Sequence, residues 1–252
     1  MKYGVQLYSL RETAEKSGAE EVLRLVAEAG YDGVEFAGFY GKTPEEMKAL
    51  LAEYGLTGIS AHIRPEAVEA NLPFIDALGI RYVFIPWAGT EEFESPEKYA
   101  ALVGNAKRAK ALLDARGVEF GYHNHAHEFE NGKDYVGKIL ADVKGLTAEL
   151  DVFWAAVAGL DAAEKMRELK GKLSLVHIKE AAEENAREAA QPVVGEGAVG
   201  MAAVFDEAKR QGIGWAVLEV EKFPCGEAEY LRRSLENMKN SENKGEKRRW
   251  KK

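Results

Sequence analysis

The sequence has few of the residues that build covalent or thiolate-based structures. Its 252 residues include a single cysteine, Cys225, so no disulfide can form within the chain. A zinc site with several thiolate ligands is excluded for the same reason. No apolar run reaches about 18 residues, the length that a membrane-spanning helix needs. No proline-rich linker or change in composition divides the chain into separate domains.

Positive charge is scarce outside the last residues of the chain. The net charge is -8, but residues 239–252 hold seven Lys or Arg and two Glu, a net +5 that leaves -13 on the rest. An acidic body argues against a nucleic-acid partner, because contacts with phosphates need positive surface. We expect the basic tail, residues 239–252, to be disordered and without a binding role. Residues 1–5 enter a strand-like run directly, so we expect no signal peptide and a cytoplasmic location.

The rest of the chain alternates short apolar runs, typical of strands, with longer helical stretches. Strands are predicted at residues 3–8, 32–36, 57–62, 81–87, 118–125, 147–151, 173–177 and 215–219. Helices are predicted at residues 19–29, 44–54, 95–116, 135–143, 161–169, 201–211 and 227–238, and a further helix follows the third strand and ends at about residue 78. Thr43, followed by Pro44 and two glutamates, indicates a capped start for the second helix.

Eight strand–helix units are the number that a TIM barrel contains. The rival is an open doubly wound sheet, which usually has a glycine-rich phosphate loop after its first strand. Residues 8–11, Tyr-Ser-Leu-Arg, are no such loop. We therefore predict an α/β fold with a single (β/α)8 barrel over residues 1–238.

The chain has only five histidines, and their placement is the strongest signal. All five histidines fall at or just after the ends of predicted strands, where the active sites of such barrels lie. A lone histidine is more often a hydrogen-bonded structural residue, but five of five at this position favour a functional site. They are His62, His123, His125, His127 and His177.

Two carboxylates join these histidines. Asp151 ends the sixth predicted strand and Glu219 the eighth, so four consecutive strands offer one candidate ligand each: His123, Asp151, His177 and Glu219. A bound cation would remove the cost of burying unpaired carboxylates in the barrel. Imidazole and carboxylate ligands suit one Mn, Mg, Co, Fe or Zn divalent ion, without selecting among them. In the alternative reading, Asp151 caps the next helix and Glu219 pairs with Lys179 or Lys222.

Strand alternation places further residues on the same faces as these candidates. Gly33 and Glu35 share a face in the second strand. In the fifth strand Gly121, His123 and His125 share a face.

With these residues the chain resembles the xylose-isomerase-like superfamily of sugar isomerases and epimerases, and within it the sugar phosphate isomerase/epimerase branch. The resemblance runs from end to end and is most specific where YHNHxHEF, LDVFW and VHIKE occur together. The matching segments are GVQLYSLR (4–11), GYDGVEF (30–36), SAHI (60–63), GYHNHAHEF (121–129), ELDVFWAAVAG (149–159), LVHIKE (175–180), VGEGAV (194–199) and LEVEK (218–222).

The resemblance implies one divalent metal held by Glu, Asp, His and Glu from strands five to eight. Asp151, His177 and Glu219 match the last three ligands, whereas His123 stands where the family has its first glutamate. In the family's epimerases the two glutamates are also the acid/base pair, so this chain keeps only Glu219 of that pair in register. Glu128, in the following loop, is the candidate for the second catalytic carboxylate.

The chemistry implied is proton removal next to a carbonyl group, with a metal-stabilised enediolate. The expected substrate is a small sugar or polyol-derived molecule. We expect it to be bound by His62, His125, Lys179, Trp87 and Glu35, while Trp154 offers a further apolar face. No membrane partner is expected, and a homo-oligomer is possible because enzymes of this superfamily often associate.

Three other functions remain open at the level of sequence. A lyase or dehydratase acting on a keto-sugar or keto-inositol needs the same enolisation and fits the loss of one carboxylate. Endonuclease IV shares the superfamily fold, but five histidines and an acidic body disfavour its three-zinc site and DNA surface. A barrel that binds sugar without catalysis is disfavoured by the complete set of four ligand positions.

Overall fold

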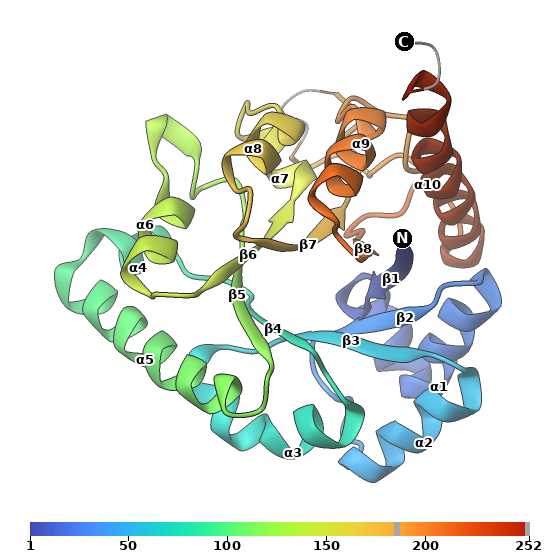
Figure 1. Cartoon of the computed structure of the whole chain (residues 1–252). Helices are drawn as coiled ribbons and strands as arrows, with labels where there is room; N and C mark the ends of the chain where they lie inside the picture. Colours follow the sequence, from blue (N-terminus) through green and yellow to red (C-terminus); the bar gives the residue numbers. More distant parts are fainter. Residues whose placement is uncertain (184–186, 250–252) are drawn as a thin grey trace.

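The computed structural model describes residues 1–183 and 187–249, and within them eight parallel strands close into one barrel (Figure 1). Each strand pairs with the next along the chain, and the last pairs with the first. The predicted (β/α)8 barrel is therefore confirmed. The strands are β1 (Lys2–Gln6), β2 (Gly33–Phe36), β3 (Thr57–His62), β4 (Tyr82–Ile85), β5 (Glu119–His123), β6 (Thr147–Asp151), β7 (Leu173–Ile178) and β8 (Trp215–Leu218).

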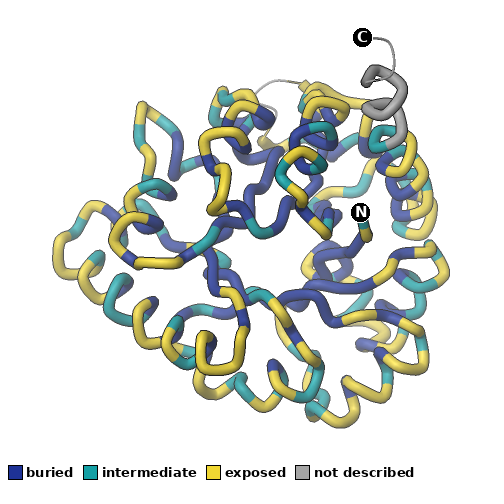
Figure 2. Tube along the Cα trace, viewed as in Figure 1, coloured by how far each residue is buried: buried dark blue, intermediate teal, exposed yellow. Residues whose placement is uncertain are grey.

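Helices surround the barrel and cover the outer faces of its strands. Figure 2 shows buried backbone through the strands and exposed positions on the outward sides of the helices. The α-helices are α1 (Arg11–Ala29), α2 (Pro44–Tyr54), α3 (Val68–Leu78), α4 (Thr90–Glu94), α5 (Pro96–Asp114), α6 (Tyr135–Asp142), α7 (Val152–Val157), α8 (Ala162–Glu168), α9 (Met201–Gln211) and α10 (Glu227–Arg249). The short 3-10 helices are η1 (Leu7–Leu10), η2 (Pro65–Ala67) and η3 (Glu130–Gly132).

Besides the short helix α4, Thr90–Glu94, which was not predicted, three helices differ from the predictions. The helix predicted from residue 19 begins at Arg11, and a left-handed φ of 82° at Gly18 interrupts it. This first part carries no apolar periodicity, which is why the pattern did not reveal it. Helix α7 was not predicted, because five of its six residues are buried and leave no amphipathic pattern.

The third difference concerns the carboxyl end of the chain. Helix α10 continues to Arg249, so residues 239–249 of the tail that was expected to be disordered are helical. Glu242 explains the extension in part: its two carboxylate oxygens accept hydrogen bonds from the amino group of Met1 at 3.2 Å and from the Tyr3 hydroxyl at 2.5 Å. Figure 1 shows α10 beside the amino terminus. Residues 250–252 of the predicted tail lie outside the described residues.

The barrel interior has an apolar layer that supports the polar site above it. Ile59, Phe84, Leu175 and Val217 form this layer and are at most 1% exposed. Glycines face the larger members: a Cβ at Gly121 would lie 2.6 Å from the Phe84 ring. The interior is therefore filled by side chains, and open space begins only beyond the carboxyl ends of the strands.

No helix in the described part of the chain is long and apolar enough to cross a membrane.

Candidate active site

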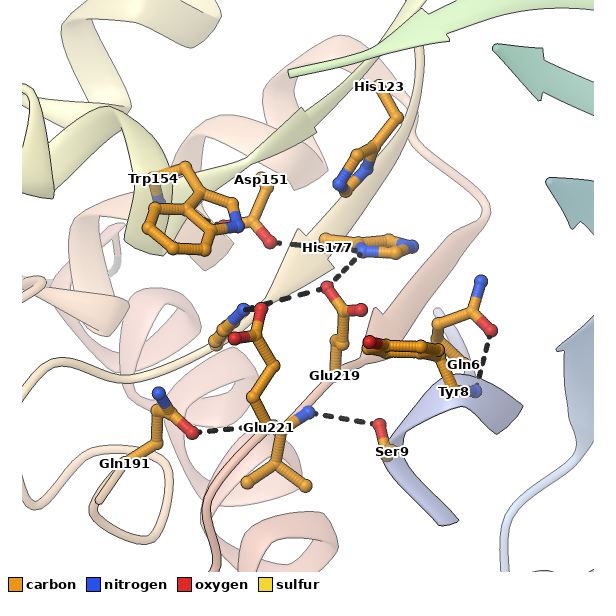
Figure 3. A network of polar contacts seen from close by, with 12 residues as sticks. Gln6, Tyr8, Ser9, His123, Asp151, Trp154, His177, Gln191, Glu219 and Glu221 are labelled. Carbon is orange, nitrogen blue, oxygen red and sulfur yellow. Dashed lines mark hydrogen bonds and ion pairs between the residues drawn. The ribbon is translucent and has the colours of Figure 1, made fainter. Parts of the chain in front are cut away.

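Three candidate ligands meet at the carboxyl ends of the last three strands. Asp151 is the final residue of β6, His177 lies in β7, and Glu219 directly follows β8. The Nδ1 atom of His177 is 3.3 Å from Glu219 Oε2 and 3.9 Å from Asp151 Oδ2 (Figure 3). His123, the last residue of β5, completes the group, and one ligand atom from each of the four lies within 4.8 Å of the others. The structure thus brings together the complete ligand set predicted from the sequence.

The two oxygens of Asp151 have different environments. Oδ1 caps α7 by accepting a hydrogen bond from the Trp154 backbone N–H at 2.9 Å. Oδ2 is buried and has no hydrogen-bond partner among the described residues. An unpaired buried carboxylate oxygen is unfavourable, and a bound cation would satisfy it. Capping therefore leaves one oxygen available as a ligand, and the residues present fit a divalent ion.

Glu219 belongs to the candidate ligand group and also lies close to Lys179, one of the two lysines considered as its ion-pair partner. Its Oε2 atom lies 3.8 Å from Lys179 Nζ, while Lys222 pairs instead with Glu188. Burial opposes ionisation of Glu219, but Lys179 and His177 outweigh this effect and hold its pKa below the usual range. Glu219 is therefore a carboxylate at neutral pH, the form that can bind a metal or accept a proton.

Burial controls the protonation of two other candidate ligands. It raises the pKa of Asp151 to about 7, against the opposing charge of Lys179. For His123, burial and the neighbouring His177 lower the pKa well below its ordinary value. His123 is thus a neutral imidazole, which is the protonation state of a metal ligand.

A second polar layer lies against the first and was only partly predicted. Glu149, on β6, was not singled out as a site residue, yet its Oε2 atom lies 2.8 Å from His62 Nε2 and 3.2 Å from His123 Nδ1. It forms a second possible metal-binding group with His62, His123 and His177. The signal was strand alternation: Glu149 is two residues before Asp151 and shares its face.

Glu35 lies in this second layer and not on the wall of the cavity. It is fully buried and accepts hydrogen bonds from Gln6 at 2.7 Å and from Ser60 at 2.5 Å. Its Oε1 atom is also 2.6 Å from His177 Nε2, which leaves Nδ1 of that ring to face Asp151 and Glu219. We therefore replace the predicted contact of Glu35 with substrate by a role in orienting His177.

A cavity of about 500 Å³ opens above the ligand group, a size suited to a small polyhydroxy molecule. Five residues predicted at the site line it: His62, His123, His125, Trp87 and Glu219. Trp154 lines it as well. Sequence reasoning did not assign Tyr8, Arg187 and Glu221, which also contribute to the wall. Tyr8 and Trp87, which are 46% and 45% exposed, contribute two accessible aromatic rings to this wall.

Besides Glu35, two residues predicted to contact the substrate or act on it do not line the cavity. Lys179 is fully buried, ion-paired with Glu221 and positioned over the ring of Trp154 at 4.6 Å, so its ammonium group is held by protein and not on the cavity wall. The carboxylate of Glu128 accepts hydrogen bonds from the Tyr122 hydroxyl at 2.7 Å and from the His125 backbone N–H at 2.9 Å.

Tyr122 explains the position of Glu128. It alternates with His123 on β5 and points to the outer face of the barrel, and Glu128 follows it there. The prediction that Glu128 supplies the second catalytic carboxylate is therefore corrected: Glu128 does not line the cavity, and its two oxygens accept hydrogen bonds from the Tyr122 hydroxyl and the His125 backbone N–H.

The sequence matches a known protein family over most of its length. The model of one family, the xylose isomerase-like TIM barrel, matches residues 23–241. The chain belongs to this family. The match covers seven of the eight strands, including those that carry the four candidate ligands. No functionally curated protein matches the sequence.

Solved structures similar to this xylose isomerase-like barrel include enzymes of different kinds. A sugar phosphate isomerase/epimerase from Parabacteroides distasonis is 22% identical, with a TM-score of 0.76 over 94% of this chain and 97% of that one. A D-allulose 3-epimerase from Methylomonas sp., in complex with D-allulose, is 17% identical, with a TM-score of 0.72 over 96% and 97%. A probable 3-DHS dehydratase from Bacillus anthracis is 15% identical, with a TM-score of 0.75 over 95% and 99%. At these identities the likeness establishes a shared fold.

Proposed function

We propose that this protein is a divalent-metal-dependent enzyme that isomerises or epimerises a small sugar or polyol-derived ketone. The observation that carries the proposal is the convergence of Asp151 Oδ2, His177 Nδ1 and Glu219 Oε2 beneath a cavity of about 500 Å³. Membership of the xylose isomerase-like family and the sugar-acting enzymes among its structural neighbours support this choice.

The residues that would hold the metal are His123, Asp151, His177 and Glu219. A divalent ion held there would supply Lewis-acid chemistry: it would polarise a carbonyl oxygen and stabilise the negative charge that develops when a neighbouring carbon loses a proton. The donor set of two imidazoles and two carboxylates suits Mn, Mg, Co, Fe or Zn ions.

Glu219 would act as the base that removes this proton. It is the ligand-group carboxylate that lines the cavity, and its lowered pKa keeps it ionised at neutral pH. His125 and Trp87 would contact the hydroxyl groups and the apolar face of the substrate, since both line the same cavity. The rings of Trp87 and His125 lie 4.6 Å apart and would together exclude water from that side.

A second candidate reaction is elimination from a keto-sugar or keto-inositol. The absence of Glu128 from the cavity wall favours this possibility, because the chain then lacks the second carboxylate of the family's epimerases. The structural likeness to a probable dehydratase is consistent with elimination on this fold. Both reactions begin with the same removal of a proton by Glu219.

Incubation with defined ketoses in deuterated buffer tests the proposal. The protein is first freed of metal with a chelator, reloaded with Mn²⁺, and given D-allulose or methyl 3-keto-glucoside while NMR follows the substrate. We expect deuterium to enter at the carbon next to the carbonyl group. Inversion at that carbon identifies an epimerase, and release of methanol identifies a lyase. Failure to bind any divalent ion at micromolar concentration would contradict both.

A further inference from the structure

His62 has the environment of a residue that transfers protons. It is the last residue of β3 and lines the cavity. Its Nε2 atom lies 2.8 Å from Glu149 Oε2 and 3.1 Å from Glu35 Oε1. The other ring nitrogen, Nδ1, makes no hydrogen bond within the described part of the chain, and the side chain is 10% exposed where it lines the cavity. One edge of the imidazole is thus held by buried carboxylates while the other edge is free for a ligand.

The position of His62 in the barrel complements that of Glu219. In the closed order of strands, β3 is three places from β8, so the two side chains enter the cavity from nearly opposite walls. A substrate bound between them would present one face of its reacting carbon to each. This is the arrangement that inversion at a carbon requires, since one group removes the proton and another delivers it on the far side.

Three other polar residues in or beside the cavity are less suited to this task. His125 lines the cavity, but its Nδ1 atom is buried without a partner, and no carboxylate among the described residues contacts its ring nitrogens. His123 belongs to both possible metal-binding groups, including the one that contains Glu219, whereas His62 belongs only to the group around Glu149. The carboxylate of Glu128 is held outside the cavity by Tyr122.

We propose that His62 is the second proton-transfer residue of this site, with Glu149 as the positioning residue that holds its ring. This assignment rests on the function proposed above. His62 thus takes the proton-transfer role of the family's first glutamate, whose position in this sequence is occupied by His123.

The proton balance of the proposed inversion is as follows. Glu219 takes the proton from the carbon next to the carbonyl group, and the electron pair of that bond forms the double bond of an enediolate. His62, as imidazolium, then gives its Nδ1 proton to the opposite face of the same carbon, and the carbonyl group is restored. Glu219 has gained one proton and His62 has lost one, and exchange with solvent returns both to their starting states. In an elimination, the same proton would go to the departing oxygen.

Deuterium exchange separates this role from the role of Glu219. In the His62→Gln variant, Glu219 still removes and returns the proton on its own face. We therefore expect deuterium from solvent to enter unreacted substrate near the wild-type rate, while inversion or elimination falls about 100- to 10,000-fold. The probes are D-allulose and methyl 3-keto-glucoside with Mn²⁺-loaded protein, and the Mn²⁺ affinity should stay within threefold of wild type.

Chemical rescue gives a second, independent measurement. The His62→Ala variant leaves space for a small azole, and added imidazole should restore turnover at least tenfold. If His62→Ala does not fold, His62→Gln, which keeps more of the side-chain volume, still provides the exchange measurement. The assignment is overturned if His62→Gln keeps turnover within threefold of wild type, or if its loss of turnover is accompanied by loss of Mn²⁺ binding. Lack of Mn²⁺ binding or exchange in the wild-type protein would instead contradict the proposed function.

The positioning role of Glu149 has its own control. Glu149→Gln should lower turnover in the wild-type background and have much less effect in His62→Gln, because residues that act as a unit give non-additive losses. Glu207→Gln is the matched control, since Glu207 is a buried carboxylate on α9 that pairs with Arg210 outside the barrel. Equal, additive losses from Glu149→Gln in both backgrounds would contradict action through His62.

Discussion

At the scale of single residues, the site depends on carboxylates that are buried but still have a free oxygen. Asp151 gives one oxygen to the start of α7 and keeps the other unpaired. Glu219 lies between His177 and Lys179, whose charges keep it ionised. Asp151 and Glu219 therefore stabilise the fold locally and each still contributes an oxygen to the candidate ligand group.

Glu219→Gln tests the base at this scale. The amide keeps the shape of the side chain but can neither accept the substrate proton nor bind a metal as a carboxylate does. We expect loss of both turnover and deuterium exchange, with a melting temperature within a few degrees of wild type. Activity measured by NMR and unfolding followed by circular dichroism check this, and retained exchange would exclude Glu219 as the base.

His123→Ala tests the departure from the family's ligand pattern. Removing one of four ligands should weaken Mn²⁺ binding by at least tenfold, as measured by titration calorimetry. His127→Ala is the comparison, because His127 is outside the candidate ligand set and its Nε2–H donates a hydrogen bond to the Ala88 carbonyl oxygen at 2.8 Å. Unchanged metal affinity in His123→Ala would show that His125 provides the fifth-strand ligand.

At the scale of elements, one glutamate organises the segment between β7 and α9. Glu180 is buried, and its carboxylate accepts hydrogen bonds from the backbone N–H groups of Ala181, Gly195 and Val199 at 2.8–3.2 Å. Gln191, in the same segment, accepts a hydrogen bond from the backbone N–H group of Glu221 (Figure 3). It accepts a second one from the backbone N–H group of Lys222. The segment is thereby tied to the chain that follows Glu219.

Glu180→Gln should loosen this segment. The amide nitrogen cannot accept a hydrogen bond, so at least one buried N–H group loses its partner at a cost of roughly 1–3 kcal/mol. We expect a lower free energy of unfolding and faster proteolysis within residues 181–200. Glu183→Gln, at an exposed position of the same segment, is the control and should behave as wild type.

The start of α2 provides a prediction about pH. Thr43 and Glu46 form the reciprocal hydrogen bonds of a capping box, as the sequence indicated. The bond from the Thr43 backbone N–H lowers the pKa of Glu46 below its ordinary value of 4.5. A lowered folded-state pKa contributes stability above the unfolded-state value, and this contribution is lost as the pH falls through the folded-state value.

Urea unfolding of wild type and Glu46→Gln between pH 3 and pH 7 measures this contribution. The difference in free energy of unfolding should be largest near pH 7 and should shrink below the ordinary glutamate pKa of 4.5. A difference that does not change with pH would show that the ionised form of Glu46 contributes nothing. Thr43→Ala, which removes the other half of the box, should cost about 1 kcal/mol at pH 7.

At the scale of the whole molecule, the candidate ligands come from four consecutive strands of one closed sheet. Asp151, His177 and Glu219 are far apart along the chain and meet only when β6, β7 and β8 are in register. A metal bound by them should therefore bind the folded protein and not the unfolded chain, which couples metal binding to global stability.

Metal removal tests this coupling. At a Mn²⁺ concentration about 100 times its Kd, binding should add about 2.7 kcal/mol, which corresponds to roughly 5–10 °C in melting temperature for a chain of this size. Differential scanning calorimetry with and without EDTA measures the shift. Asp151→Asn should abolish the shift while the metal-free protein still unfolds cooperatively. An equal shift in Asp151→Asn would place the ion elsewhere.

The sequence by itself determined the barrel and the four candidate ligands. Strand alternation is a local property of the backbone, and the ends of parallel strands in a closed barrel must meet, so residues at those ends could be assigned without coordinates. The same rule could have identified Glu149, which shares a face with Asp151. The capped start of α2 was readable for the same reason, since its hydrogen bonds join residues only three apart.

Tertiary structure decided the roles of the remaining polar residues. Glu128 follows Tyr122 to the outer face, Lys179 is enclosed by Glu221 and Trp154, and Glu35 supports His177 from across the barrel. The partners of Lys179 and Glu35 are distant in sequence, and the direction of a loop side chain such as Glu128 follows no strand period. A buried charged group lies where it finds its partners, and those positions exist only once the chain has folded.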